Sequence, residues 1–365
     1  MPSTVIAPYV PPPVPSPSQA FGLGPSLSRN GRGIVDLTII WAFLIAFAVA
    51  MYVVMDGFDL GIGILFPGFR VGKERDQAMN AIAPVWDGNE TWLVLGGGGL
   101  MAAFPLAYAI ILPALYAPLI AMLLGLIFRG VAFEFRWRDP GHRRWWDAGF
   151  FLGSAVATFA QGVTLGALLQ GISIEGRAYA GGWWEWLSPF SLLTGASLLI
   201  GYALLGACWL IWKTEGEIQA DARRYARPLL PALLLAFGAV SLGTPFLEEQ
   251  YYRRWFEFPG LLVTVPMPLL VLVTSWSLWR SFSGSKDHRP FLLALALFLL
   301  AMIGLAISMW PDVIPGRVTI WEAAAPETSQ IFMLVGAAVL IPLILAYTAW
   351  SYWVFRGKVG EEGYH

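Results

Sequence analysis

The stretch Met55-Asp56-Gly57-Phe58-Asp59-Leu60-Gly61-Ile62-Gly63 places two carboxyl groups inside a long apolar run that extends from about Leu37 to Phe66. Residues three apart lie on one face of a helix. Ionisable side chains inside a membrane span are costly and commonly mark an ion or proton pathway. The three glycines allow a second backbone to approach closely. The stretch therefore predicts a functional acidic site where two helices meet.

The composition places the whole chain in the membrane. Of its 365 residues, 57% are hydrophobic and only 13% are charged, and the mean hydropathy is +0.63. A soluble domain has about a quarter of its residues charged. The net charge of −1 gives no support for a nucleic-acid partner, and the single cysteine, Cys208, excludes an internal disulfide and a multi-cysteine metal site.

Histidine is scarce and badly placed for haem binding. The three histidines are His142, His288 and His365, each in a polar, charged segment. A haem in a membrane domain normally takes an axial histidine from a helix. We therefore expect this chain to ligate no cofactor or metal, and any redox metal to belong to a partner chain.

The apolar runs predict an all-α membrane protein with about nine transmembrane helices. Residues 1–33 read as a disordered Pro-rich arm, 34–356 as the nine-helix domain and 357–365 as a cytoplasmic tail. The uncharged stretch Thr91–Phe128 is about twice the length of one span, so it predicts a helical hairpin with its turn near Pro105. The other predicted spans are Leu37–Met55 continuing to Phe66, Ala148–Ile172, Leu187–Trp212, Pro228–Leu247, Phe258–Leu278, Pro290–Trp310 and Gln330–Phe355.

Lysine and arginine predict the orientation. The connections after odd-numbered spans, together with the tail, hold 16 basic residues, and those after even-numbered spans hold 4. Basic residues concentrate on the cytoplasmic side of a membrane. The N-terminus is therefore predicted outside and the C-terminus in the cytoplasm, which puts Asp56 and Asp59 toward the cytoplasmic end of the first span.

A second pair of acids opens the second span, in Val85-Trp86-Asp87-Gly88-Asn89-Glu90-Thr91-Trp92. Asp87 and Glu90 are again three apart and again near the cytoplasmic end. Four carboxyl groups from two helices could face one another where protons enter, and burial can make such groups exchange protons near neutral pH. In the alternative, Asp56 and Asp87 cap or end helices. For Asp56 both roles stay open, whereas Asp59 and Asp87 favour a function.

The third span ends in Phe128-Arg129-Gly130-Val131-Ala132-Phe133-Glu134, where two charges lie among apolar and aromatic residues. Arg129 could reach the interface as a snorkelling side chain. It could instead pair with an anionic group, either a membrane carboxylate or a propionate on a partner's cofactor. The sequence leaves both roles open.

These motifs resemble a known family. Met55–Gly61, Ala83–Trp92 and Phe128–Glu134, with Lys213–Glu217 and Tyr347–Trp353, are similar to subunit II of the cytochrome bd-type quinol oxidases, with details nearest the cyanide-insensitive branch. The resemblance runs from about residue 34 to 356, and the Pro-rich arm falls outside it.

The resemblance implies a haem-free subunit of a bacterial inner-membrane enzyme that oxidises quinol and reduces O₂ to water electrogenically, with protons from the cytoplasm. It implies that two b-type haems and one d-type haem lie in subunit I, the heterodimer partner, which this chain stabilises. It also implies that Asp59 and Asp87 belong to the proton route, and that Trp86 and Asp87 approach the partner's haem region. Small accessory subunits and a quinone resident in this chain are found in some members.

Two other functions compete with the oxidase subunit. A proton-coupled secondary transporter could use Asp56, Asp59 and Asp87 as its coupling site, although the sequence shows no clear inverted repeat and no paired broken helices. A structural scaffold would have no proton role at all. We place Asp56, Asp59, Asp87 and Glu90 on a predicted proton pathway, and Trp86, Asp87, Arg129 and Glu134 at the partner's haem region.

Overall fold

The computed structural model describes residues 36–359, which form α-helices joined by short connections. The predicted arm and residues 360–365 of the predicted tail lie outside the described residues. The longer helices are α2 (Leu37–Leu65), α4 (Trp86–Ala103), α5 (Pro105–Arg138), α6 (Arg143–Leu169), α7 (Pro189–Lys213), α8 (Gly216–Gly243), α11 (Pro266–Ser281), α12 (His288–Met309) and α14 (Glu327–Val354). Shorter elements are α3 (Lys73–Asn80), α9 (Glu249–Phe256), α10 (Leu261–Thr264), α13 (Ile320–Ala323), the 3-10 turns η1 (Phe66–Gly68), η2 (Pro140–His142) and η3 (Thr244–Phe246), and two antiparallel hairpins, β1 (Ile174–Glu175) with β2 (Ala178–Tyr179) and β3 (Asp312–Ile314) with β4 (Val318–Thr319).

Eight helical segments within residues 36–359 are long and apolar enough to cross a membrane, and each coincides with a predicted span. The remaining predicted span is α4, whose polar first turns and five glycines lower its hydropathy. Helix α4 ends at Ala103 and α5 begins at Pro105, so the hairpin turn lies where it was predicted. The all-α membrane class is confirmed. A spanning helix satisfies its own backbone groups, which is why an apolar run of this length folds in this way.

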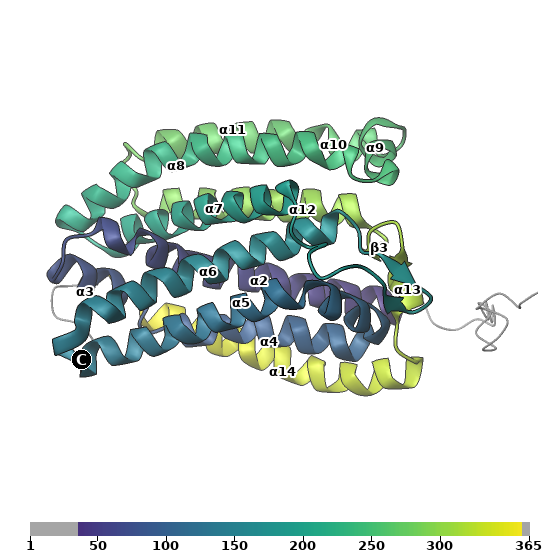
Figure 1. Ribbon diagram of the computed structural model, residues 1–365. Coiled ribbons are helices and arrows are strands. Elements are labelled where there is room, and N and C mark those ends of the chain that lie inside the picture. Colours follow the sequence, from purple (N-terminus) through teal and green to yellow (C-terminus); the bar gives the residue numbers. More distant parts are fainter. Residues whose placement is uncertain (1–35, 360–365) are drawn as a thin grey trace, which may run out of the picture. The chain divides into compact units, whose positions relative to one another are not determined.

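Helix α2 packs on α4, α6 and α7, and α7 is the most buried of the eight segments (Figure 1). The contact between α2 and α7 brings two backbones together. A Cβ atom on Gly61 would lie 1.8 Å from the Tyr202 carbonyl oxygen, and one on Gly206 would lie 2.4 Å from the Gly61 carbonyl carbon. Glycine at both positions permits this approach. The predicted helix contact at the acidic stretch is therefore present.

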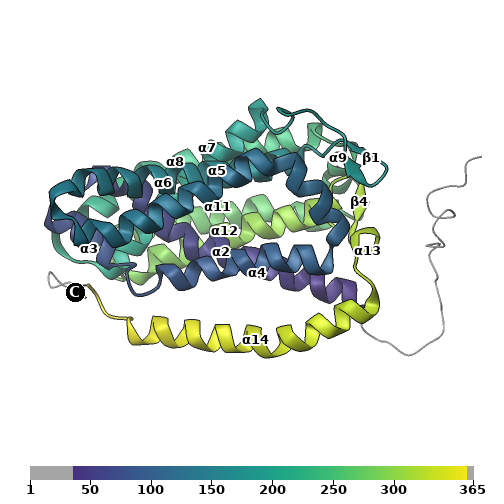
Figure 2. The ribbon, with the colours of Figure 1, turned by 60° about the horizontal axis from the view of Figure 1, so that its bottom comes forward.

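Helix α14 is the least buried of the apolar helices. Gln330 and Ile341 are its buried residues, and its other side chains are exposed or half-buried. Near its start, the Trp41 indole donates a hydrogen bond to the Gln330 carbonyl at 3.1 Å. Near its other end, Tyr352 reaches α4. Figure 2 shows α14 in yellow alongside α4.

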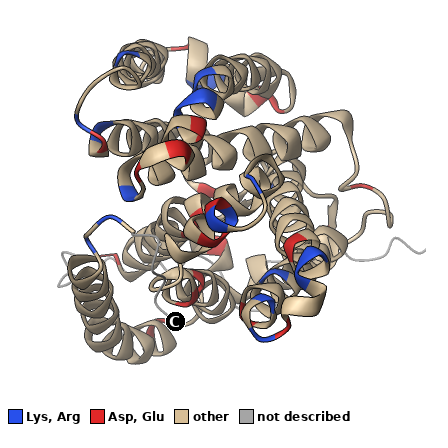
Figure 3. Cartoon of the chain, turned by 90° about the vertical axis from the view of Figure 1, so that its left-hand side faces the viewer, with Lys and Arg blue, Asp and Glu red and all other residues tan. Residues whose placement is uncertain are grey.

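Charged residues gather at one end of the helices, which we call the α3 end (Figure 3). It contains α3, the connections α5–α6, α7–α8 and α11–α12, and residues 355–359. Arg70 pairs with Glu217 on α8 at 2.6 Å, and Arg223 on α8 pairs with Asp287 of the α11–α12 connection at 2.5 Å. These ion pairs bring connections together that are distant in sequence.

A buried ionic network joins α3, α5 and α6 at this end. Arg136, 1% exposed, lies 2.5 Å from Asp147 Oδ1 and 2.7 Å from Asp76 Oδ1. Arg75 lies 2.7 Å from the other oxygen of Asp147. Both guanidinium groups also lie over the Phe66 ring. The network holds the C-terminal end of α5 against α3 and α6.

Candidate functional site

Arg129 on α5 is fully buried and brings together acids of two other helices. Its Nη1 lies 3.0 Å from Asp56 Oδ1 on α2 and 2.6 Å from Glu90 Oε1 on α4. Its Nη2 lies 3.8 Å from Asp59 Oδ2, one turn further along α2. The Trp86 ring covers the guanidinium, with Cζ at 5.8 Å from the ring centroid. We call Asp56, Asp59, Glu90 and Arg129 the acidic cluster.

Small residues bring α5 and α6 close together behind Arg129. A Cβ atom on Gly153 would lie 2.7 Å from the backbone nitrogen of Arg129, and one on Gly125 would lie 2.7 Å from the Gly153 carbonyl oxygen. The backbone of α6 therefore closes against α5 here. The guanidinium accordingly extends toward α2 and α4.

Asn89 links the cluster to α14. Its Nδ2 donates to Asp59 Oδ2 at 2.7 Å and lies 3.4 Å from the Met55 carbonyl oxygen. On the other side of the amide, the Tyr352 hydroxyl donates to Asn89 Oδ1 at 2.9 Å. Asn89 is 1% exposed, so its amide is shielded from the surroundings, whereas Tyr352 is half-buried.

A second hydrogen-bond chain reaches the cluster from α6 and α7. The Tyr202 hydroxyl donates to Gln161 Oε1 at 3.1 Å, and Gln161 Nε2 donates to the Tyr52 hydroxyl at 2.7 Å. Tyr52 lies beside Asp56, one turn earlier on α2. Neutral polar groups of α2, α6 and α7 thus form a hydrogen-bonded chain that ends beside Asp56.

The acidic cluster has unused hydrogen-bonding capacity. Asp56 Oδ2, Asp59 Oδ1, Arg129 Nε and Arg129 Nη2 are buried and have no hydrogen-bond partner within residues 36–359. Such atoms in proteins are ordinarily met by ordered water. The groups present can therefore bind water or exchange a proton in addition to holding one another.

The structure brings together four of the predicted site residues and separates the others. Asp56, Asp59, Glu90 and Arg129 are in contact, and Trp86 packs over Arg129. Asp87 is exposed on the first turn of α4 and does not enter the cluster. Glu134 is also exposed, 3.9 Å from Arg138. The roles predicted for all these residues stay predictions.

The positions of Asp56 and Arg129 in the structure exclude one of the two roles considered for each. Asp56 does not end a helix, because α2 continues unbroken to Leu65. Arg129 is not a snorkelling side chain, because it is buried against membrane carboxyl groups. Sequence reasoning missed Asn89, Tyr352 and Tyr52, although the first two lie inside the quoted motifs. Neutral polar residues are common, and no sequence pattern marks those that contact a buried acid.

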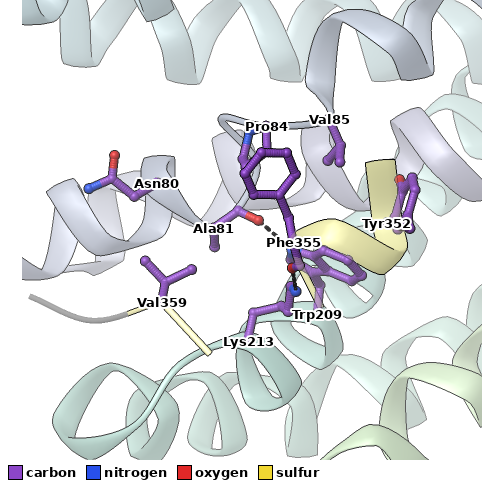
Figure 4. A pocket seen from close by; sticks show the side chains of 9 residues that line it. All are labelled: Asn80, Ala81, Pro84, Val85, Trp209, Lys213, Tyr352, Phe355 and Val359. Atoms are coloured by element: carbon purple, nitrogen blue, oxygen red, sulfur yellow. Dashed lines mark hydrogen bonds between the residues drawn. The ribbon is translucent and has the colours of Figure 1, made fainter. Parts of the chain in front are cut away.

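A small cavity lies beside Tyr352 at the α3 end (Figure 4). Its volume of about 10 Å³ is close to the space that one water needs. Residues 355–359, which we call the C-terminal strap, close one side of it. Lys213 Nζ donates to the carbonyl oxygens of Phe355 at 2.5 Å and Gly357 at 3.0 Å, and the Val359 amide donates to the Lys213 carbonyl at 2.7 Å.

The side chains of residues 36–359 are not arranged as a haem or metal site. His142 and His288 are exposed at the ends of helices, and His142 is hydrogen-bonded to Asp139. Across the described residues, no group of three His, Cys, Asp or Glu side chains is placed to hold a metal ion. A haem would need axial ligands from the helices.

A family model described as cytochrome bd terminal oxidase subunit II matches residues 37–355. The chain belongs to this family. It is 31% identical over 373 residues to the cytochrome bd-I ubiquinol oxidase subunit 2 of Escherichia coli (strain K12), covering 89% of this chain and 96% of that protein. It is 29% identical over 344 residues to the cytochrome bd ubiquinol oxidase subunit 2 of Bacillus subtilis (strain 168), covering 90% and 98%.

A solved structure agrees at the level of the fold. The structure of bd oxidase from Geobacillus thermodenitrificans matches with a TM-score of 0.71 and 18% identity, covering 89% of this chain and all of that one. The resemblance read from the motifs is confirmed. The chain is a subunit of a cytochrome bd-type quinol oxidase, an oxidoreductase complex, and a multi-pass protein of a bacterial inner membrane. Its family membership as subunit II implies a subunit I partner.

Proposed function

We propose that the acidic cluster is a proton-transfer site on the route by which the oxidase takes protons from the cytoplasm to O₂. One observation carries the proposal. A single buried guanidinium, that of Arg129, meets carboxyl groups of two helices, and among these only Glu90 is partly exposed, at 27%.

The charge balance of the cluster supports a proton role. Three ionised carboxyl groups facing one guanidinium would leave two negative charges in excess. Uncompensated charges in a low-dielectric interior cost several kcal/mol each. The cluster becomes neutral when two of its three carboxyl groups carry protons. A site built in this way holds protons that can be exchanged one at a time.

The distribution of basic residues supports the direction of the route. The connections at the α3 end carry most of the lysine and arginine, so this end belongs in the cytoplasm and the N-terminal side belongs outside. The cluster lies in the half of α2 nearer to the α3 end. Protons would therefore reach it over a short distance.

Individual roles follow from burial. Asp59, fully buried and hydrogen-bonded to Asn89, is the main proton carrier, and Asp56 shares the guanidinium of Arg129 with it. Glu90, the partly exposed member, hands protons toward the partner. Asp87 and Glu134 are charged yet exposed on membrane helices, which supports placing them with Trp86 against subunit I in the complex.

We assign the haems to subunit I and quinol to the assembled complex, because the histidines described above do not fit a haem site in this chain. The haems and O₂ carry out the redox chemistry in that subunit. This chain stabilises subunit I and supplies protons. A quinone held within this chain and small accessory subunits remain predictions.

The test is carboxamide substitution in the assembled complex. We expect Asp59→Asn to slow quinol-dependent O₂ uptake about 100-fold, at the lower end of the effect of losing a positioned proton-transfer group. Haem content, measured by absorption, should stay unchanged. Asp56→Asn and Glu90→Gln should also slow uptake.

Glu217→Gln is the matched control, because Glu217 is an exposed carboxyl group at the same end of the helices. It should leave O₂ uptake unchanged. Full activity of Asp59→Asn with intact haem would reject the proton route and leave this chain as a scaffold.

A further inference from the structure

Asn89 lies between a group that gains and loses a proton and a hydroxyl group that can reverse its hydrogen bond. Its Nδ2 faces Asp59 at 2.7 Å and its Oδ1 faces the Tyr352 hydroxyl at 2.9 Å. We propose that Asn89 and Tyr352 form a two-position hydrogen-bond switch that gives Asp59 a partner in both its ionised and its protonated form. This inference rests on the proposed function, since it concerns the proton that Asp59 carries.

The hydrogen bond between Asn89 and Asp59 Oδ2 has to change when that oxygen takes up a proton. An ionised carboxylate only accepts hydrogen bonds, whereas a carboxylic acid must also donate one. As observed, the Asn89 amide donates to Asp59, which suits the ionised form. When Asp59 Oδ2 takes up a proton, that O–H faces an N–H. A half-turn of the Asn89 amide exchanges its nitrogen and oxygen in place, so that Oδ1 accepts from Asp59.

The other oxygen of Asp59 faces no acceptor within the described chain. Asp59 Oδ1 is buried and has no hydrogen-bond partner there. A proton on Oδ1 would need an ordered water as its acceptor. A proton on Oδ2 faces Asn89, a fixed side chain that can accept it once its amide has turned.

Tyr352 makes the second position possible. After the half-turn, the Asn89 Nδ2 faces the Tyr352 oxygen, and a hydroxyl group can rotate to accept as well as to donate. A phenylalanine at this position could do neither. Tyr352 and Asn89 exchange no proton with Asp59. They are positioning residues, while the proton itself comes from cytoplasmic water and leaves toward the partner.

The charged groups around Asp59 remain in place in both positions. Arg129 on α5 lies 3.8 Å away, Asp56 lies one turn away on α2, and Glu90 lies on α4. Tyr52 on α2 and Tyr202 on α7 lie near Asp56. Within residues 36–359, the Asp59 carboxyl contacts the Arg129 guanidinium, which only donates, and the Asn89 amide, which can both donate and accept.

Infrared difference spectra of the complete oxidase, recorded over a pH range, test the switch. The band of protonated Asp59 is the carboxylic C=O stretch that disappears in Asp59→Asn. A carboxylic acid that loses its hydrogen bond stretches at a higher frequency. We expect Asn89→Leu to shift this band upward, and Tyr352→Phe to shift it by less in the same direction. Tyr352→Phe removes one oxygen atom, and haem absorption verifies that each variant assembles.

Tyr347→Phe is the matched control, because Tyr347 is an exposed tyrosine on the same helix. It should leave the band unmoved. An unshifted band in Asn89→Leu and Tyr352→Phe would overturn the switch, even if Asp59→Asn slows turnover and the proposed function stands. The absence of any Asp59 band in the parent enzyme would also overturn it. A shift in Asn89→Leu alone would overturn the role of Tyr352.

Discussion

Arg129 and Arg136 lie seven residues apart on the same helix, both are buried, and each pairs with carboxylates of other helices. Their surroundings differ. Arg129 meets acids of two helices within the apolar part of the bundle, whereas Arg136 belongs to a network with Arg75, Asp76 and Asp147 at the α3 end. One helix thus carries both a candidate proton site and the ionic network that holds its end.

Arg136→Met should destabilise the fold. The substitution leaves the Asp147 carboxylate, 7% exposed, with Arg75 as its remaining partner. Breaking a buried ion pair on one side costs about 3–5 kcal/mol. Thermal loss of native haem absorption in the detergent-solubilised complex should occur at a clearly lower temperature. Arg138→Met removes an arginine that is 75% exposed, and it should change stability by less than about 1 kcal/mol. Equal effects of the two substitutions would contradict the buried network.

Gly61→Ala should prevent α2 and α7 from packing. The added methyl group would lie 1.8 Å from the Tyr202 carbonyl oxygen, which is backbone and cannot move aside easily. We expect a loss of about 3 kcal/mol, at the upper end of overpacking effects, and a lower yield of assembled complex. Gly97→Ala on α4 is the control, because nothing lies within 4 Å of its added atom. A normal yield for Gly61→Ala would show that the helices are less tightly packed.

The attachment of the C-terminal strap should depend on pH. Burial alone would raise the pKa of the Asp287 carboxyl, but the hydrogen bond and charge of Lys358 and the charge of Arg223 hold it below its usual value. The pKa of Asp287 is thus lower in the folded state than its unfolded value of about 4, so the ionised carboxylate stabilises the strap above that pH. This stabilisation is lost as the pH falls through the pKa of the folded state. Hydrogen exchange at the Val359 amide, corrected for its intrinsic rate, should therefore accelerate in acid.

Asp287→Asn tests the origin of that pH dependence. It should accelerate exchange at neutral pH and remove the additional acceleration in acid. The same interaction raises the pKa of Lys358, although burial alone would lower it, so the contact between Lys358 and Asp287 should persist in mild alkali. An unchanged acid response in Asp287→Asn would assign it to another group.

Lys213→Met should release the strap at neutral pH. Its ammonium group donates to two carbonyl oxygens of residues 355–359, and charged hydrogen bonds contribute about 1.5–3 kcal/mol each. A net loss of about 2 kcal/mol predicts roughly 30-fold faster exchange at Val359, with α7 unchanged. Lys286→Met, at an exposed lysine of the same end, should have no effect. Release of α7 itself would mean that Lys213 holds the helix and not the strap.

Much of the architecture could be predicted because a membrane leaves few options. Apolar runs of about 20 residues become spanning helices, and Pro105 marks the hairpin turn within residues 91–128. The acids of α2 and the glycines beside them were recognised for the same reason, since charge is rare and expensive in such runs. These features depend on local sequence and general physical costs.

The remaining features depend on contacts between distant residues. Tyr352 and Asn89 are 263 positions apart, and neither residue type attracts notice in a polar segment near a helix end. Asp87 and Glu90 illustrate a finer limit. Three residues leave them about 60° apart around α4, and that rotation is enough to expose one and bury much of the other. Sequence spacing cannot fix the rotation of a helix about its axis.

Among the described residues, helix α14 follows every other membrane helix in the sequence, yet it supplies Tyr352 to Asp59's partner Asn89. During synthesis α14 must therefore leave the ribosome before the hydrogen bonds around Asp59 can be complete. Until then, Asn89 lacks the Tyr352 hydroxyl as a partner. The order of translation thus keeps the site unfinished while the helices that precede α14 insert.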